Sequence, residues 1–241
     1  MPKHKKEDFS WFKASFACFS IFVLFSIIQF IVLIYCLLNH GFSFNEIMSS
    51  QKILEENQLY FVSQVSIISS VSGIFLILLF SKCLYKNTRL ALPIHKERFI
   101  DIGIWIMIFY LLFLCIQFLT TLLGIDITAS NFTKEVLVYS SSLPLLFYAI
   151  GIAQPIFEEF LFRGLLFKGL ENKIGGIKTV FITSFLFVLP HIQYDITILL
   201  LILFPSALIL GFCRLKTNSL TIPIIIHCIN NTVSLIIALN S

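Results

Sequence analysis

Several uninterrupted apolar runs restrict the fold of this chain more than any other feature, because each reaches about 18 residues or more, the length that an α-helix needs to cross a bilayer. The alternative, buried helices in a large soluble protein, requires polar sequence around them. Only 12% of the 241 residues are charged, whereas 58% are hydrophobic. We therefore expect an all-α protein, a polytopic helical bundle in a membrane.

The apolar runs and the turn-forming residues between them predict about seven transmembrane helices. These are expected over residues 11–38, 59–83, 100–124, 141–172, 175–192, 195–213 and 219–239. The first follows a basic start like that of a signal peptide, but its apolar stretch is too long and no small-x-small cleavage site follows. We expect it to be retained as a helix.

The basic residues are unevenly distributed over the connections. Fifteen of the 17 lie before the first helix, between the second and third, around the turn after the fourth, or after the sixth. Because connections rich in Lys and Arg stay in the cytoplasm, we expect a multi-pass protein of the cell membrane, with a cytoplasmic N-terminus and an extracellular C-terminus. This distribution accounts for the net charge of +4, so the expected surrounding is the lipid bilayer and no nucleic-acid partner is expected.

The six cysteines lie in or at the ends of apolar runs, and no CxxC pair occurs. Cysteine in such places behaves as a small hydrophobe. We expect neither disulfides nor a metal cluster from them.

Glu158, Glu159 and Arg163 are unusual because they fall within the fourth apolar segment. Each charge at the centre of a membrane helix opposes insertion by about 2.5–3.5 kcal/mol. An i,i+4 pair at a cytoplasmic helix end explains Glu159 and Arg163. Glu158 is turned away from this pair, on a stripe of the helix surface that also carries Gly151 and Pro155. Since Pro155 leaves the carbonyl of Gly151 without its helical partner, the stripe predicts a polar cavity beside Glu158.

The segment from Phe187 to His191, FVLPH, brings a histidine toward Glu158. Residues 172–176, NKIGG, form a turn midway between the two, and a hairpin about it places each side chain about 22–24 Å from the turn. A lone helical histidine is otherwise a packed side chain bound to a carbonyl. We expect Glu158 and His191 to face each other at the same depth.

The last helix carries a third polar group, in which Pro223, His227, Asn231 and Ser234 share one face. Measured from Ser219, His227 lies about 12 Å deep. Interhelical hydrogen bonding is the alternative role for Asn231. The three groups together supply a carboxylate, two imidazoles and an amide, and ionisable clusters within a membrane are functional-site hypotheses by default. They provide a base for water and donors for an oxyanion, which amide hydrolysis needs.

On these residues the chain resembles the CPBP family, also called Abi, of CAAX-prenyl proteases and bacteriocin-processing endopeptidases. The family pattern is EExxxR, FxxxH and HxxxN, and the matches begin at Glu158, Phe187 and His227. The resemblance covers about the last 100 residues. It implies a catalytic core of four spans in residues 141–241, preceded by three N-terminal spans in residues 1–140.

The resemblance also implies a role for each matched residue. Glu158, with His191, activates a water as general base. His227 and Asn231 hold the developing oxyanion. The residues that support the site are Glu159, Arg163 and Phe187.

Metal dependence and one departure from the family pattern stay open. Glu158, His191 and His227 are also a ligand set of zinc peptidases, so zinc is the alternative cofactor. We expect no metal and no other cofactor, because Asn231 is a poor zinc ligand but a good oxyanion donor. Pro190, directly before His191, is unusual for the motif, and we expect it to bend or end the fifth helix and to displace His191.

Three classes of function fit this pattern to different degrees. The first is an intramembrane endopeptidase that cleaves peptide or membrane-protein substrates near the cytoplasmic face. The second is a non-catalytic bacteriocin-immunity or scaffold protein that binds a peptide in the same cavity. A transporter or channel fits least, because the spans before residue 150 carry few charges. A prenylated CAAX protein is one candidate substrate; the Lys-, Ile-, Asn- and Phe-rich composition favours a bacterium, and there a leader peptide or a membrane protein.

Overall fold

The computed structural model describes residues 11–50, 53, 57–85, 88–125 and 131–240. Within them every regular element is a helix, and six helices are long and apolar enough to cross a membrane. The expected all-α membrane bundle is confirmed. Five basic residues used for the expected orientation fall outside the described residues: Lys3, Lys5, Lys6, Lys52 and Lys86.

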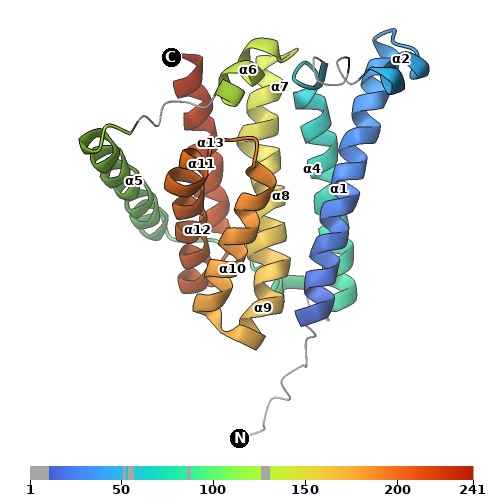
Figure 1. The fold of residues 1–241 in the computed structure, drawn as a ribbon. Helices are drawn as coiled ribbons and strands as arrows, with labels where there is room; N and C mark the ends of the chain where they lie inside the picture. The colour runs from blue at the N-terminus through green and yellow to red at the C-terminus, as the bar shows by residue number, and fades with distance from the viewer. Residues whose placement is uncertain (1–10, 51–52, 54–56, 86–87, 126–130, 241) are drawn as a thin grey trace, which may run out of the picture.

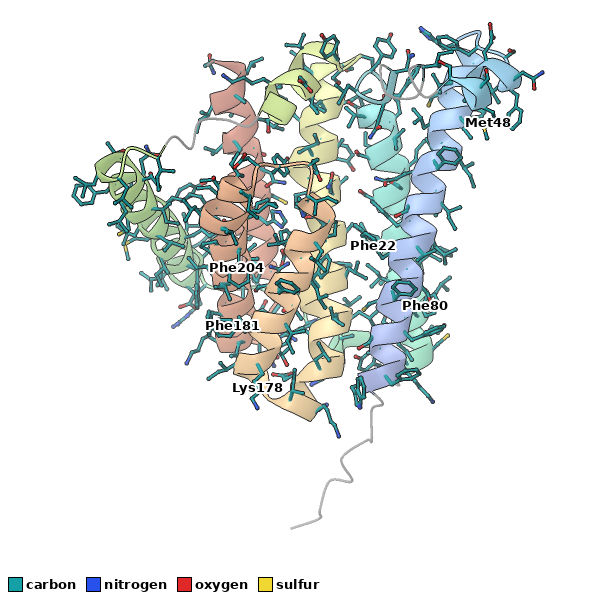
Figure 2. All side chains as sticks on the ribbon, viewed as in Figure 1. Phe22, Met48, Phe80, Lys178, Phe181 and Phe204 are labelled. Atoms are coloured by element: carbon teal, nitrogen blue, oxygen red, sulfur yellow. The ribbon has the colours of Figure 1, made fainter. Side chains whose placement is uncertain are left out.

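The N-terminal part contributes three long helices and shorter connecting ones. They are α1 (Trp11–Asn39), α2 (Phe44–Ser49), α4 (Val62–Leu84), η1 (Thr88–Leu90), α5 (Phe99–Leu122) and α6 (Asn131–Tyr139). Figure 1 shows α1 and α4 side by side, whereas α5 leans away from the other helices on the opposite flank. Large apolar side chains cover the outside of these helices (Figure 2), as is expected of surfaces that face lipid.

The C-terminal part forms the centre of the bundle. Its first long helix joins α7 (Leu143–Tyr148), η2 (Ala149–Ala153), α8 (Gln154–Glu159), η3 (Phe160–Leu166) and α9 (Phe167–Ile174). A hairpin then leads into α10 (Gly176–Val188) and η4 (Leu189–His191). The last two long helices are α11 (Ile196–Ile198) with η5 (Leu199–Leu203) and α12 (Phe204–Thr217), and α13 (Thr221–Leu239). Each expected span matches a helix to within a few residues, and the fifth is the short α10 with η4.

The two ends of the bundle differ in charge. The start of α1 and the α9–α10 turn lie at one end, and α2, α6 and the C-terminus lie at the other (Figure 1). The first end, here called the basic end, carries Lys13, Lys82, Lys168, Lys173 and Lys178 among others. We call the opposite end the outer end. Of the fifteen basic residues that the sequence places on alternate connections, Arg163 and Arg214 are buried within the bundle and four lie outside the described residues, so the asymmetry of the two ends rests on the other nine.

Prolines explain part of the irregular geometry of the C-terminal helices. The segments η2, η3 and η5 are π-helical, with wider turns than an α-helix. Pro155 follows η2 and Pro205 follows η5 within two residues. A proline supplies no N–H to the preceding turn, and π-helical turns inside α-helices frequently occur at functional sites.

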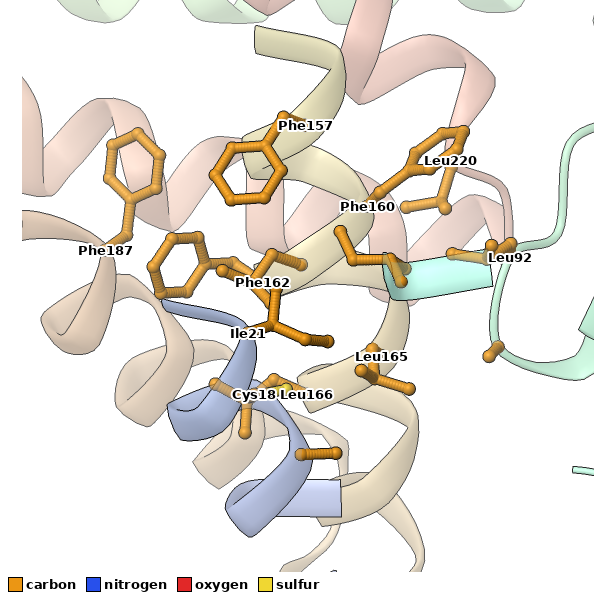
Figure 3. Packing of buried hydrophobic residues seen from close by; sticks show 14 of the residues in the cluster. Cys18, Ile21, Leu92, Phe157, Phe160, Phe162, Leu165, Leu166, Phe187 and Leu220 are labelled. Atoms are coloured by element: carbon orange, nitrogen blue, oxygen red, sulfur yellow. The ribbon is translucent and has the colours of Figure 1, made fainter. Parts of the chain in front are cut away.

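The largest buried apolar cluster fills the basic half of the bundle. It joins Cys18 and Ile21 of α1 to Phe160 and Leu165 of η3 and to Leu220 before α13 (Figure 3). Gly164 allows this packing, because a Cβ atom there would lie 2.6 Å from Cδ2 of Leu92. Among the described residues, this close packing fills the space between the basic end and the centre of the bundle.

Candidate active site

Glu158 lies in α8, near the middle of the helix that runs from Leu143 to Ile174, and its side chain is buried. Gln154, one turn earlier, donates a hydrogen bond from Nε2 to Glu158 Oε1 at 2.9 Å. The other carboxylate oxygen, Oε2, is 3.6 Å from Nε2 of His227. One oxygen is therefore fixed within its own helix, and the other faces a neighbouring helix.

His227 connects the two adjacent glutamates. Its Nδ1 donates to Oε1 of Glu159 at 3.0 Å, while its Nε2 faces Glu158. Glu159 has no exposed surface and lies 3.5 Å from Nη1 of Arg163. A buried carboxylate requires such partners, since its desolvation penalty is otherwise uncompensated.

The expected i,i+4 pair of Glu159 and Arg163 is present, but its expected place at a helix end is wrong. Both side chains are fully buried, and the helix continues past Arg163 to Ile174. The reason is that α13 packs against α8 and α10 packs against η3, with His227 of α13 supplying a partner for Glu159 and the carbonyl of Ala207 a partner for Arg163. The pair therefore belongs to the interior of the site.

Arg163 is held by groups from two other helices. Its Nη2 donates to the carbonyl of Ala207 at 3.1 Å, and its guanidinium lies 4.4 Å from the ring centre of Phe187. A second buried arginine, Arg214 of α12, donates from Nε to the carbonyl of Arg163 at 3.0 Å. From the sequence, Arg214 is expected among the basic residues of the loops that connect the helices. Its buried partners are distant in sequence, so no local pattern indicates them.

Phe187 lies at the centre of the aromatic contacts. Its ring stacks on His191 with centres 5.0 Å apart and meets the ring of His227 edge-on at 5.7 Å. His191 donates from Nδ1 to the carbonyl of Phe187 at 2.9 Å, which leaves Nε2 for the cavity. Pro190 ends α10 at Val188, as expected, yet His191 still lines the cavity and is not displaced from it.

Asn231 compensates for the π-helical turn before Pro155. The N–H of Gln154 bonds to the carbonyl of Ala149 in that turn, and Pro155 has no N–H. The carbonyl of Ile150 thus loses both helical donors, and Nδ2 of Asn231 donates to it at 3.1 Å. We had expected the carbonyl of Gly151 to be the unpaired one; the wider turn moves the vacancy by one residue.

Gly151 brings α13 close to this turn. A Cβ atom at Gly151 would lie 2.8 Å from Oγ1 of Thr232, the residue after Asn231. The expectation that a small residue permits close approach of another helix is confirmed here.

The four residues expected to be catalytic line one cavity of about 240 Å³: Glu158, His191, His227 and Asn231. Several amide side chains that sequence reasoning passed over as tolerated polar residues line it too, namely Gln29, Gln58, Gln154, Gln193 and Asn230. For Gln154, its place one turn before Glu158 was an available signal. Glu158 and His191 thus share a cavity as expected, although the contacts of Glu158 are with Gln154 and His227.

The cavity extends toward the outer end of the bundle. Its lining reaches Gln58 before α4, Val62 at the start of α4 and Val136 of α6, all at the outer end. The apolar cluster of Figure 3 occupies the basic end instead.

Tyr194, in the loop after His191, also lines the cavity. Its ring stacks over that of His191 with centres 6.2 Å apart, and it shares a hydrogen bond with Thr133 of α6. Burial raises the pKa of Tyr194 above its ordinary value, so its hydroxyl stays neutral and can donate a hydrogen bond.

A zinc ion does not fit the side chains as they are arranged. In the part of the chain that the structure describes, no group of three His, Cys, Asp or Glu side chains could hold a metal ion. His227 turns its two ring nitrogens to two different glutamates, and His191 uses Nδ1 for a carbonyl. The expectation of a metal-free site stays a prediction.

Comparisons with known proteins support the resemblance to the family. Residues 140–233 match the family model described as type II CAAX prenyl endopeptidase Rce1-like. The membrane-embedded CAAX protease MroQ of Staphylococcus aureus (strain USA300) is 27% identical over 105 residues, which are 41% of this chain and 41% of MroQ. An uncharacterised 24.3 kDa protein of Escherichia coli is 32% identical over 93 residues, which are 36% of this chain and 41% of that protein.

The chain thus matches about two fifths of the length of these curated relatives. No solved structure matches it. The matched part contains all seven residues of the candidate site.

Proposed function

Residues 140–233 of this chain belong to the CPBP family, and from this premise we propose that the protein is an intramembrane endopeptidase that hydrolyses peptide bonds of peptides or membrane proteins. The observation that carries the proposal is the shared cavity of Glu158, His191, His227 and Asn231. Three helices supply a base and donors to a single space, which is the minimum that water-dependent amide hydrolysis requires.

In the proposed reaction, Glu158 takes a proton from a water as the water oxygen attacks the carbonyl carbon of the peptide bond. Gln154 holds one carboxylate oxygen, so the other is directed at the water. His191, through its Nε2, holds the same water. The proton then passes to the peptide nitrogen as the C–N bond breaks, which leaves a new carboxyl group and a new amine.

The negative charge on the carbonyl oxygen is stabilised by His227 and Asn231. Asn231 spends one N–H on Ile150 and keeps a second for the oxyanion. Protonated His227 donates from Nε2, while Glu159 accepts from its Nδ1, as the carboxylate does in carboxylate–histidine pairs of hydrolases.

The test compares three strains of the native host. One contains the wild-type protein, one the Glu158→Gln variant and one the Glu135→Gln variant, all at equal levels in the membrane. Glu135 is exposed on α6 and serves as the matched control. New N-termini of host proteins, identified by mass spectrometry, are expected in the wild type and the control and absent in Glu158→Gln. Equal sets of termini in all three strains would contradict the proposal.

A non-catalytic immunity or scaffold role is the other outcome of the same comparison. In that case the host phenotype persists in Glu158→Gln and is lost only when the cavity is reshaped, as in His227→Ala. A leader peptide or membrane protein is proposed as substrate ahead of a prenylated CAAX protein, and the sequences at the new termini distinguish these classes.

A further inference from the structure

The cavity is closed toward the basic end. Below Glu158, the side chains of Phe160, Leu165 and Leu220 pack against α1 and the connection before α5 (Figure 3). Glu159 and Arg163 on this side have no exposed surface. Among the described residues, this packing separates Glu158 from the basic end.

Toward the outer end, the exposure of the lining residues increases in steps. Glu158 and His227 are buried, His191 is half-buried, and Gln58 and Gln193 are exposed. Gln58 precedes α4, and Gln193 lies in the loop between η4 and α11. The surface of the protein thus meets the cavity at these two glutamines.

The fifth helix is shorter than the other long helices of the bundle. With 13 residues in α10 and 3 in η4, it is about 24 Å long at 1.5 Å per residue, whereas the hydrocarbon core of a bilayer is about 30 Å thick. Figure 1 shows the loop between α10 and α11 lying below the outer ends of α7 and α13. The loop is therefore at membrane depth.

Irregular backbone at that depth is tolerated only inside a protein or beside water. Gln193 and Asp195 of this loop are exposed. The backbone N–H of Thr197 donates to Oδ1 of Asp195 at 2.8 Å. A charged side chain at that depth needs water or an ionic partner beside it, so the entrance proposed below places water next to this loop.

The chemistry of the lining indicates what enters. Six amide side chains face the cavity, and Glu158 is its single acidic group among the described residues. An amide offers a donor and an acceptor, the same groups that an extended peptide backbone needs. At about 240 Å³ the cavity is smaller than the pockets of about 300–1,000 Å³ that hold drug-sized ligands; it accommodates the residues around the cleaved bond and not a folded partner.

We propose that the cavity is a hydrated entrance open at the outer end, and that the substrate is an extended, uncharged polypeptide segment presented from the extracytoplasmic side. The inference rests on the proposed function for the cleavage step. It rests on the positive-inside rule for the identity of the outer side.

Cysteine labelling tests the entrance without any substrate. Gln193→Cys and Lys178→Cys are a matched pair, because the two exposed residues lie near opposite ends of the fifth helix (Lys178 in Figure 2). Each is introduced into a chain in which the exposed Cys83 and Cys115 are serines, and this parent chain gives the background. A membrane-impermeant maleimide is added to intact cells and then to permeabilised cells.

Gln193→Cys is expected to react in intact cells, and Lys178→Cys only after permeabilisation. The reverse pattern overturns the proposal, because the cavity would then face the cytoplasm. Failure of Gln193→Cys to react under either condition overturns it as well, because the loop would then not be hydrated.

The positions of the cleavage sites give a second, independent readout. New termini that depend on Glu158 are expected in exported segments or at the extracytoplasmic ends of membrane helices, within stretches free of charged residues. Termini in cytoplasmic segments overturn the inference but leave the peptidase function intact. Loss of all Glu158-dependent termini overturns the peptidase function, whatever the labelling shows.

Discussion

His227 donates a hydrogen bond to Glu159 at 3.0 Å and turns its other ring nitrogen to the neighbouring Glu158 at 3.6 Å. Two consecutive glutamates of one helix therefore have different surroundings. Glu159 is fully buried against a histidine and Arg163, while Glu158 lines the cavity with an amide partner. Different environments assign different roles to chemically equal carboxylates.

Glu159→Gln and Glu158→Gln are expected to fail in different ways. The first leaves the buried charge of Arg163 without its carboxylate and should lower the free energy of unfolding by about 3–5 kcal/mol. The second removes the base but keeps the hydrogen bond with Gln154, so the fold should persist while cleavage stops. Thermal unfolding in detergent distinguishes them. Equal melting temperatures for both variants would contradict the burial of the Glu159–Arg163 pair.

Asn231 is expected to have a structural role that Pro155 creates. Asn231→Ala leaves the carbonyl of Ile150 unsatisfied, at a cost of about 1–3 kcal/mol. In a Pro155→Ala background the new N–H can reach that carbonyl, so the same substitution should cost clearly less. A double-mutant cycle of unfolding free energies measures the difference; additive costs would show that the proline is not the cause.

The same cycle separates structure from catalysis. If Asn231 also holds the oxyanion, cleavage stays low in the double variant even though its stability recovers. Recovery of both together would assign Asn231 a structural role alone.

The spans and the meeting of the three motifs could be predicted because they depend on local signals. Apolar runs locate the helices, and the turn at residues 172–176 sets the register of Glu158 against His191. The burial of Arg163 could not be predicted in this way. Its partners, Ala207 and Phe187, come from other helices, and no pattern within its own helix indicates them.

The π-helical turns and the extension of the cavity toward the outer end could not be predicted, for a related reason. Pro155 indicated a free carbonyl, but which carbonyl becomes free depends on whether the turn widens. The proposed outer opening depends on how Gln193 and Gln58 come to line one cavity, and these two residues are far apart in the sequence. Charges counted along the chain fix the direction of the helices and say nothing about which end of a cavity is filled.

Close packing at Gly151 predicts sensitivity to a single methyl group. Gly151→Ala places a Cβ atom 2.8 Å from Oγ1 of Thr232, so α13 must move and carry His227 and Asn231 with it. We expect lower stability and reduced cleavage. Gly103→Ala on α5 is the control: no atom lies within 4 Å of its new Cβ, and stability should rise slightly because alanine favours a helix by about 1 kcal/mol.

Thr232→Ala in the Gly151→Ala background provides the rescue. Removing the Thr232 hydroxyl clears the space that the new methyl group needs, so cleavage should recover at least in part. Absence of any recovery would mean that helix approach at this point does not position the site.

Purified protein is expected to contain no stoichiometric zinc and to keep its activity in a chelator. The physical reason is that the nitrogens of His227 face two different glutamates instead of one common point. Metal analysis and a chelator titration measure this. Activity that is lost to the chelator and restored by zinc would contradict the metal-free mechanism.

Arg214→Met is expected to destabilise the protein far more than Lys216→Met, two residues later on the same helix. Arg214 is buried; it donates to the carbonyl of Arg163 at 3.0 Å and from Nη1 to Oδ1 of Asn218 at 2.9 Å. Asn218 has a positive φ of 51° at the end of α12, so the second bond supports a strained cap. Hydrogen bonds of charged groups contribute about 1.5–3 kcal/mol. We expect the free energy of unfolding to fall by that amount in Arg214→Met, measured by thermal unfolding.

Lys216 is exposed, so Lys216→Met makes the same change of charge and should lower the free energy of unfolding little. Equal losses of stability in the two variants would mean that charge, and not the bond to the Arg163 backbone, is responsible.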